Sequence, residues 1–240
     1  MSTLFISDLH LSENQPEITQ TFISFLEAQA SDAKALYILG DIFDLWIGDD
    51  DDRPLVTSIS QRLQQLSQHC DIYLMQGNRD FLLGEQYAKQ CSATLLADPT
   101  VIDLYGTPTL LMHGDTLCTD DVEYQQYRAM VHTPQWQEQV LSQSLEARRK
   151  LADHIKMESH QAKSEKSMEI MDVNAGAVIE AFEAHNVQQL IHGHTHRPAV
   201  HQLEVAGKPA TRYVLGDWKP KLWWLEANEG GLTLHNRDFG

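Results

Sequence analysis

The sequence predicts an α/β fold, in which buried strands and helices alternate along the chain. Three strand-like apolar runs, at 3–7, 35–40 and 71–75, are separated by two segments with helical spacing. The chain has 240 residues, of which 42% are hydrophobic, so it is long enough to build a substantial core. We therefore expect a single domain over residues 1–240.

The remaining elements follow from the spacing of apolar residues. The first helix is expected at about 16–30, where apolar side chains recur at i, i+4, i+7 and i+8 (Ile18, Phe22, Phe25 and Leu26). The second is expected around 55–69. Further strands are expected at the starts of 109–115 and 189–196, each ending in a polar loop. The alternating pattern near the C-terminus indicates a β-rich region.

Residues 119–170, called the lid segment below, differ in composition from the rest of the chain. They contain no Gly, one Pro, and many Gln, Glu, Lys, Arg and Met. We expect two or three helices inserted within the single domain, with Thr119 as the N-cap of the first. Residues 148–166 hold six of the chain's 18 basic residues. Such a charge run is usually a solvated face, but it also suits a surface that contacts phosphate.

Composition and charge restrict the function. A net charge of −16 argues against nucleic-acid binding through a basic face, so an anionic ligand would need metal ions or a local basic patch. Three cysteines without a C-x-x-C motif fit a reducing cytosol. The N-terminus does not resemble a signal peptide, and no apolar run approaches the roughly 20 residues of a spanning helix. The acidic run at 49–52 is expected to be a solvated loop.

Five polar clusters each follow a strand-like run: SDLH (7–10), GDIFD (40–44), GNRD (77–80), HGD (113–115) and GHTH (193–196). Because loops at the carboxyl ends of strands share one edge of a sheet, we expect their polar side chains to converge. The candidate ligands are Asp8, His10, Asp41, Asn78, His113, His194 and His196.

Carboxylates, imidazoles and an amide oxygen suit Mn²⁺, Fe²⁺ or Zn²⁺. Seven ligands are too many for one ion, but they suit two ions that share a carboxylate, about 3.5–4 Å apart. The D-x-H and H-x-H pairs are expected to be extended, so that both side chains of each pair point the same way. Each cluster alone is a weak signal, and the prediction depends on all five in this order.

The five clusters resemble the motif blocks of the calcineurin-like metallophosphoesterases, and the resemblance covers residues 4–217. It implies a β-sandwich flanked by helices, with a dinuclear metal site bridged by Asp41. One metal would be held by Asp8, His10, Asp41 and His196, and the other by Asp41, Asn78, His113 and His194. The resemblance also implies that Asp44 and Asp80 orient the ligands. His192 matches no family position, and we expect it to be structural.

Arg79 stands where many members of this superfamily have a histidine that protonates the leaving group. An arginine cannot act as a general acid, because its pKa exceeds about 12. It can bind phosphate oxygens and stabilise charge in the transition state. The leaving group is therefore expected to depart without a proton, as a phosphate monoester does, which indicates cleavage of a pyrophosphate. The alternative is a structural ion pair with Asp80 or Asp44.

GNRD, FLLG (81–84), WIGDDD (46–51) and the lid segment together resemble one branch, the UDP-2,3-diacylglucosamine pyrophosphohydrolases of Gram-negative lipid A synthesis. This resemblance implies a phosphoanhydride hydrolase with two Mn²⁺ per chain, in which a metal-bridging hydroxide attacks the α-phosphorus. The products would be UMP and 2,3-diacylglucosamine 1-phosphate. The implied substrate contacts are Asn78, Arg79, Asp121, Ser159, Lys163, Lys166 and His194. One departure from the pattern is the Asp of VLGDW (214–218), where a neutral residue is expected.

An acyl pocket is also implied by the branch. Its candidate lining is Phe81, Leu82, Leu83, Tyr124, Tyr127, Met130, Val131, Trp136, Val140 and Leu141, and the alternative for about half of these is simple core packing. The expected partner is a lipid-linked nucleotide-sugar substrate and not a nucleic acid. We expect a monomer in the cytoplasm that contacts the cytoplasmic face of the inner membrane peripherally.

Two other functions stay open from the sequence. The first is another metallophosphoesterase activity, such as that of a dinucleoside-polyphosphate hydrolase or a phosphodiesterase, which would act on soluble nucleotides. The second is a non-enzymatic, metal-stabilised lipid-binding or scaffold protein. It would hold metal but turn over no phosphoanhydride, and it would have no need of an open dinuclear site.

Overall fold

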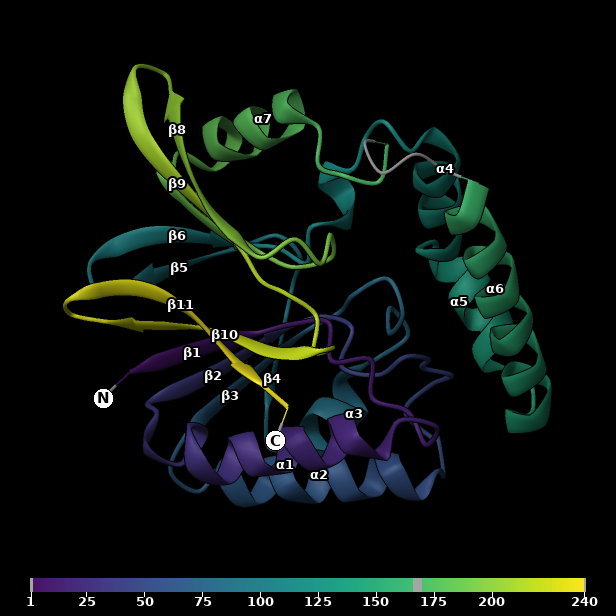
Figure 1. The fold of residues 1–240 in the computed structure, drawn as a ribbon. Coiled ribbons are helices and arrows are strands. Elements are labelled where there is room, and N and C mark those ends of the chain that lie inside the picture. Colours follow the sequence, from purple (N-terminus) through teal and green to yellow (C-terminus); the bar gives the residue numbers. More distant parts are fainter. Residues whose placement is uncertain (1, 166–169, 240) are drawn as a thin grey trace.

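Two β-sheets lie face to face between outer helices in the computed structural model of the chain (Figure 1). The structure describes residues 2–165 and 170–239, and it describes side chains over 2–157 and 170–239. This arrangement confirms the predicted α/β class with a sandwich flanked by helices.

The first sheet has six strands in the order β11-β10-β1-β2-β3-β4. Four of them are parallel: β1 (Thr3–Ile6), β2 (Ala35–Leu39), β3 (Asp71–Met75) and β4 (Thr94–Leu96). The other two form an antiparallel hairpin beside β1: β10 (Lys221–Asn228) and β11 (Gly231–Asp238). The outer face of this six-stranded sheet is covered by α1 (Pro16–Ala28), α2 (Pro54–Leu66) and α3 (Glu85–Gln90) (Figure 1).

The second sheet has five strands in the order β5-β6-β7-β9-β8. They are β5 (Thr100–Leu104), β6 (Thr107–Leu111), β7 (Gln189–His192), β8 (Ala199–Val205) and β9 (Lys208–Val214). β6 and β7 are parallel neighbours, so their carboxyl ends leave the sheet side by side. Helix α7 (Ala175–His185) packs on its outer face through Val178 and Phe182.

Covered faces explain why the central strands are continuous apolar runs. In β1, Leu4 and Ile6 pack toward the helices, whereas Phe5 packs between the two sheets. In β2, Leu36 and Ile38 likewise join the helical side, and the intervening residues join the inter-sheet core. Because successive strand residues point to opposite faces and both faces are buried, both sets are apolar.

The lid segment contains three helices among its described residues: α4 (Val122–Val131), α5 (Pro134–Leu141) and α6 (Leu145–Glu165). They lie together at one side of the sandwich (Figure 1). The predicted N-cap at Thr119 is wrong, because the Asp121 side chain accepts a hydrogen bond from the Tyr124 N–H at 3.1 Å. Within the described chain, no helix has both the length and the hydropathy that crossing a bilayer requires.

The acidic run at 49–52 is only partly the solvated loop that the sequence predicts, because Asp50 and Asp52 are exposed but Asp51 is buried. Each of its four carboxylates has a partner from the protein. Asp50 and Asp52 pair with Arg148 and Arg149 of α6. The loop therefore joins the body of the protein to the lid segment, a role that the sequence does not reveal because the partners are about 100 residues away.

Candidate active site

Side chains from five loops meet at the carboxyl ends of β1, β2 and β3 in one sheet and β6 and β7 in the other. The site therefore draws its residues from both sheets, whereas the sequence predicted a site at the edge of one sheet. The structure brings together all seven candidate ligands, which fall into two groups around Asp8 and Asp41.

The first group contains Asp8, His10 and His196. Each offers a ligand atom, and these atoms all lie within 4.8 Å of one another. The Asp8 Oδ1 lies 3.3 Å from the His196 Nε2, and the two histidine Nε2 atoms are 3.2 Å apart. This cluster corresponds to the first predicted ligand set without Asp41.

The second group contains Asp41, His113, Asn78 and His194. The Asn78 Oδ1 lies 3.1 Å from the His113 Nε2 and 2.8 Å from the His194 Nδ1. Asp8 also lies close enough to Asp41 and His113 to share an ion with them. The sequence did not predict this second role of Asp8.

Asp41 lies between the two groups. Its Oδ2 is 3.8 Å from the His10 Nδ1, and its Oδ1 is 3.9 Å from the His113 Nε2. One carboxylate oxygen thus faces each group, which is the orientation that a shared carboxylate requires. The Arg79 backbone N–H donates to the same Oδ1 at 2.7 Å and holds the carboxylate in place.

The ligand-bearing backbone is strained, and the predicted extended geometry of the D-x-H and H-x-H pairs is wrong. Five ligand residues have positive φ angles: Asp8 (55°), His10 (48°), Asp41 (54°), His194 (68°) and His196 (54°). Non-glycine residues adopt this region infrequently, and such strain concentrates at functional sites. Backbone hydrogen bonds from Asp8 N to Gly40 O and from His10 N to Asp41 O lock two of the loops together.

The glycine and the aspartate of GNRD fix the loop around Asp41. A Cβ atom on Gly77 would lie 2.2 Å from the Asp41 Oδ1, so only glycine allows this approach. The buried Asp80 carboxylate accepts hydrogen bonds from the N–H groups of Gly77 (2.7 Å), Asp41 (3.1 Å) and Ile42 (2.7 Å). Asp80 therefore orients the ligands through the backbone and not through their side chains.

The carboxylates and histidines of the site shift one another's pKa values, and His196 favours its protonated form. Burial raises the pKa of Asp8, but His196, His113 and His10 outweigh it and hold the pKa well below its usual range. Burial lowers the pKa of His196, but Asp8 and Asp217 outweigh it and raise the pKa to about 10. Burial, together with the Asp80 and Asp8 carboxylates, raises the pKa of Asp41. Cations bound here would replace these protons.

The donor set fits divalent metal ions. The Asp8 Oδ1 and the His10 Nδ1 are both buried, and neither forms a hydrogen bond in the described part of the chain, although the Asp8 Oδ1 faces the His196 Nε2 at 3.3 Å. A buried polar atom without a partner is costly unless another group satisfies it. Carboxylate oxygens and imidazole nitrogens at this spacing would be satisfied by metal ions.

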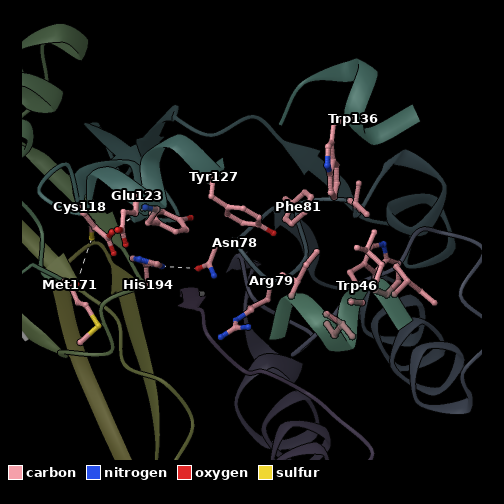
Figure 2. Close-up of a pocket in the computed structure, with 18 of the residues that line it drawn as sticks. Trp46, Asn78, Arg79, Phe81, Cys118, Glu123, Tyr127, Trp136, Met171 and His194 are labelled. Carbon is pink, nitrogen blue, oxygen red and sulfur yellow. Dashed lines mark hydrogen bonds between the residues drawn. The ribbon is translucent and has the colours of Figure 1, made fainter. Parts of the chain in front are cut away.

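Arg79 has no ion pair with either predicted acidic partner. The Asp80 carboxylate is occupied by backbone N–H groups, and Asp44 forms a short ion pair with Lys156 of α6. Figure 2 shows the Arg79 side chain beside Asn78, in the middle of a pocket. These contacts argue against the structural alternative and leave the guanidinium facing the pocket.

Asp217 is a site residue to which sequence reasoning assigned no role. Its Oδ2 lies 3.5 Å from the Nδ1 of His196, on the side of the ring opposite Asp8. A carboxylate in this position orients a metal-binding histidine. His192, in contrast, is fully buried and bonds to the Gly193 carbonyl and to Arg212, in agreement with a structural role.

A cavity of about 440 Å³ opens from the ligand cluster toward the lid segment. Asn78, Arg79 and His194 line its middle, and Trp46 and Trp136 lie farther along on one side (Figure 2). The apolar end is lined by Leu45, Trp46, Ile47, Phe81, Leu82, Trp136, Val140, Leu151, Ala152 and Ile155.

The residues predicted to line an acyl pocket match the lining of this cavity only in part. Phe81, Leu82, Tyr124, Tyr127, Trp136 and Val140 line the cavity. Leu83 and Val131 are buried in the core instead, and Met130 and Leu141 are exposed. That α6 lines the cavity was not predicted from the sequence. The signal was present, because the spacing i, i+3, i+4 and i+7 places Arg148, Leu151, Ala152 and Ile155 on one helical face.

The remaining predicted substrate contacts come from the lid segment. Asp121 lines the cavity at the start of α4. Ser159 and Lys163 lie on α6, but their side chains are outside the described ones, and Lys166 lies outside the described residues.

Comparisons with known proteins give one family. The family model described as calcineurin-like phosphoesterase matches residues 1–198. A protein of Cellvibrio japonicus named UDP-2,3-diacylglucosamine hydrolase is 53% identical over 240 residues, the full length of both chains. A Marinobacter nauticus protein of the same name is 53% identical over 95% of this chain and 94% of its own. One from Klebsiella pneumoniae is 52% identical over 91% of each chain.

Proposed function

Because the chain belongs to the calcineurin-like phosphoesterase family, we propose that it hydrolyses UDP-2,3-diacylglucosamine to UMP and 2,3-diacylglucosamine 1-phosphate. The observation that carries this proposal is a ligand cluster suited to divalent ions at the side of an apolar cavity. The names of full-length relatives at about 50% identity support the same substrate. The substrate has the matching chemistry, with a pyrophosphate beside two acyl chains.

Two Mn²⁺ ions per chain are proposed as the cofactor. Asp8, His10, Asp41 and His196 would hold one ion, and Asp41, Asn78, His113 and His194 the other. When bound, such ions supply charge that polarises phosphoryl oxygens and lowers the pKa of water from 15.7 to about 7. The orientation of the two Asp41 oxygens supports its assignment as the shared ligand.

Water adds to the α-phosphorus in this proposal, and the bond from that phosphorus to the bridging oxygen breaks. UMP therefore takes the new oxygen, and the lipid phosphate keeps the bridging one. Arg79 binds non-bridging phosphate oxygens and stabilises the charge that develops on them. It cannot protonate the leaving group, and a departing phosphate monoester does not need protonation.

The apolar end of the cavity is the proposed site of the acyl chains. Its walls come from the 45–47 loop, Phe81 and Leu82, and helices α5 and α6. Each methylene buried there contributes about 0.8 kcal/mol to binding. The same walls exclude bulk water from the reacting phosphates, which strengthens the interactions of Arg79 with them.

Residues 119–170 are proposed to act as a lid within a single domain. Large apolar side chains are exposed on its helices, namely Val122, Met130, Leu141 and Met157. We propose that these side chains make peripheral contact with the cytoplasmic face of the inner membrane. The protein is proposed to be a cytoplasmic monomer that binds no nucleic acid, in keeping with its net charge of −16.

One assay tests the function directly. The protein is incubated with Mn²⁺ and detergent-dispersed UDP-2,3-diacylglucosamine, and UMP is quantified by chromatography. UMP is expected to form, and EDTA or the substitution Asp41→Asn is expected to abolish its formation. A protein that instead cleaves soluble dinucleoside polyphosphates faster than the lipid, or cleaves neither, would refute the proposal.

A further inference from the structure

Arg148, near the start of α6, is one of the few buried charged side chains outside the ligand cluster, with 4% of its surface exposed. All three guanidinium nitrogens donate hydrogen bonds. The Nη1 donates to the Ile47 carbonyl (2.6 Å) and the Asp50 Oδ1 (2.7 Å), the Nη2 to the Asp50 Oδ2 (2.5 Å), and the Nε to the Gln143 carbonyl (3.1 Å). This side chain thus joins α6 and the turn before it to the 47–50 loop.

The loop that receives Arg148 is itself fixed to the body of the protein. Asp49 accepts hydrogen bonds from the backbone N–H groups of Gly84, Gln86 and Tyr87 at 2.8–3.0 Å. Asp51 is buried and pairs with Arg53. Successive side chains of the acidic run therefore point to opposite sides. Asp49 and Asp51 anchor the loop to the body of the protein, and Asp50 faces the lid segment.

Gly48 makes room for this contact. Its φ angle is +125°, and a Cβ atom there would lie 2.4 Å from the Arg148 Nη1 and 2.8 Å from the Leu141 Cδ2. The backbone conformation requires glycine, and a larger residue would also displace the Arg148 side chain. Hydrogen bonds from Arg148 also lower the pKa of Asp50, so the pair is charged at neutral pH.

The two sides joined by Arg148 are two of the walls at the apolar end of the cavity. Leu45, Trp46 and Ile47 lie on the loop side, immediately before Gly48, and Leu151, Ala152 and Ile155 lie on α6, one to two turns after Arg148. The hydrogen bonds of the guanidinium thus connect apolar surfaces that come from distant parts of the chain. Among the described residues, no other buried side chain forms a hydrogen bond between this loop and α6.

We propose that Arg148 and Asp50 form a clamp that sets the width of the apolar cavity and so determines affinity for the acylated substrate. This inference rests on the proposed function for the identity of the ligand. Arg148 and Asp50 are positioning residues, because neither is assigned a contact with the reacting phosphates. The clamp is expected to affect KM for the lipid and not the chemical step.

A matched control lies two residues away. Arg149 and Asp52 form a second ion pair between the same loop and the same helix, but both side chains are exposed (42% and 67%). Exposed pairs contribute little to stability, whereas a buried arginine that loses its partner is left with uncompensated charge. Asp50 is 58% exposed, similar to Asp52, so Asp50→Asn and Asp52→Asn are comparable substitutions with different expected outcomes.

The experiment measures kcat and KM of both variants for UDP-2,3-diacylglucosamine and kcat/KM for bis(4-nitrophenyl) phosphate, with Mn²⁺ present. For Asp50→Asn we expect a rise in lipid KM of about tenfold with a change in kcat of less than about twofold. Its kcat/KM for the small phosphodiester and all values for Asp52→Asn are expected to stay within about twofold of wild type. The lipid KM of Arg148→Lys is expected to lie between those of Asp52→Asn and Asp50→Asn, because a point charge cannot make all four hydrogen bonds.

Two results would overturn the clamp. Equal losses on both substrates would mean that Asp50 serves general stability, and equal effects of Asp50→Asn and Asp52→Asn would mean that only net charge matters. Amide hydrogen exchange provides a readout without turnover: residues 45–48 are expected to exchange faster in Asp50→Asn than in Asp52→Asn, and identical exchange contradicts the clamp. If wild-type protein releases no UMP, the proposed function fails, and the exchange result still decides whether the clamp exists.

Discussion

Arg79 is proposed to determine which leaving group the site favours. Its backbone N–H holds Asp41, and its side chain faces the pocket without an ion pair to Asp44 or Asp80. We expect Arg79→Ala to lose about 2–4 kcal/mol of transition-state stabilisation, the range for a single preorganised donor. Arg79→Lys should recover only part of the loss, because a lysine cannot bind two oxygens as a planar fork does. The measurement is kcat/KM on the pyrophosphate substrate.

Metal content and folding of each Arg79 variant are the controls. Arg79→His introduces an acid that this leaving group does not need, so it should not restore activity on the pyrophosphate. If Arg79→Ala folds, retains its metal and loses less than about tenfold in kcat/KM, roughly 1.4 kcal/mol, then the arginine does not act on the phosphates.

Asp217 acts on the site through His196. Its carboxylate lies beside the His196 Nδ1 and contributes to raising the pKa of that ring. Removal of such an outer carboxylate typically weakens metal affinity by about 10–100-fold. We expect Asp217→Asn to show a loss in this range when Mn²⁺ is titrated into metal-free protein. An unchanged affinity would show that Asp8 alone orients His196.

Helix α6 is proposed to have two functions along its length. Its first turns hold the Arg148 contacts, and its later part carries Lys163, which together with Lys166 is proposed to contact the substrate. We expect Lys163→Ala and Lys166→Ala to weaken activity on the lipid substrate more than on a small phosphodiester. Lys150→Ala is the control, because Lys150 is exposed and pairs only with Glu146 among the described residues. Equal losses on both substrates would limit these lysines to a structural role.

Elements with a local pattern were predicted well from the sequence. Helix α1 and strands β1, β2 and β3 lie where the periodicity of apolar residues places them, because that periodicity is set by burial of one or both faces. The first cap of the lid segment was misplaced by two residues. Thr119 and Asp121 are both good capping residues, and only the position of the first helical turn, set by packing, decides between them.

Metal binding is expected to contribute to the stability of the whole molecule. Both sheets supply ligands, and the Asp8 Oδ1 and His10 Nδ1 have no hydrogen-bond partner in the described structure. A ligand at 100 times its Kd stabilises the folded state by about 2.7 kcal/mol. We expect EDTA to lower the Tm and added Mn²⁺ to raise it with concentration. A Tm that is independent of both would contradict a metal centre between the sheets.

The sequence predicted the ligand cluster better than the cavity. The ligand motifs each follow a strand, so topology alone brings Asp8, Asp41 and His113 together. The cavity walls depend on contacts between distant segments, such as that of Arg148 with the loop at 47–50, which no local pattern encodes. For the same reason, the sequence predicted a solvated loop at 49–52 and did not reveal its ion pairs with Arg148 and Arg149 of α6.

The fate of solvent oxygen tests the proposed hydrolysis most directly. Hydrolysis of UDP-2,3-diacylglucosamine in ¹⁸O-labelled water, followed by mass spectrometry of both products, reports which phosphorus was attacked. Attack on the α-phosphorus predicts one ¹⁸O in UMP and none in 2,3-diacylglucosamine 1-phosphate. Label in the lipid phosphate, or no UMP at all, would contradict the account.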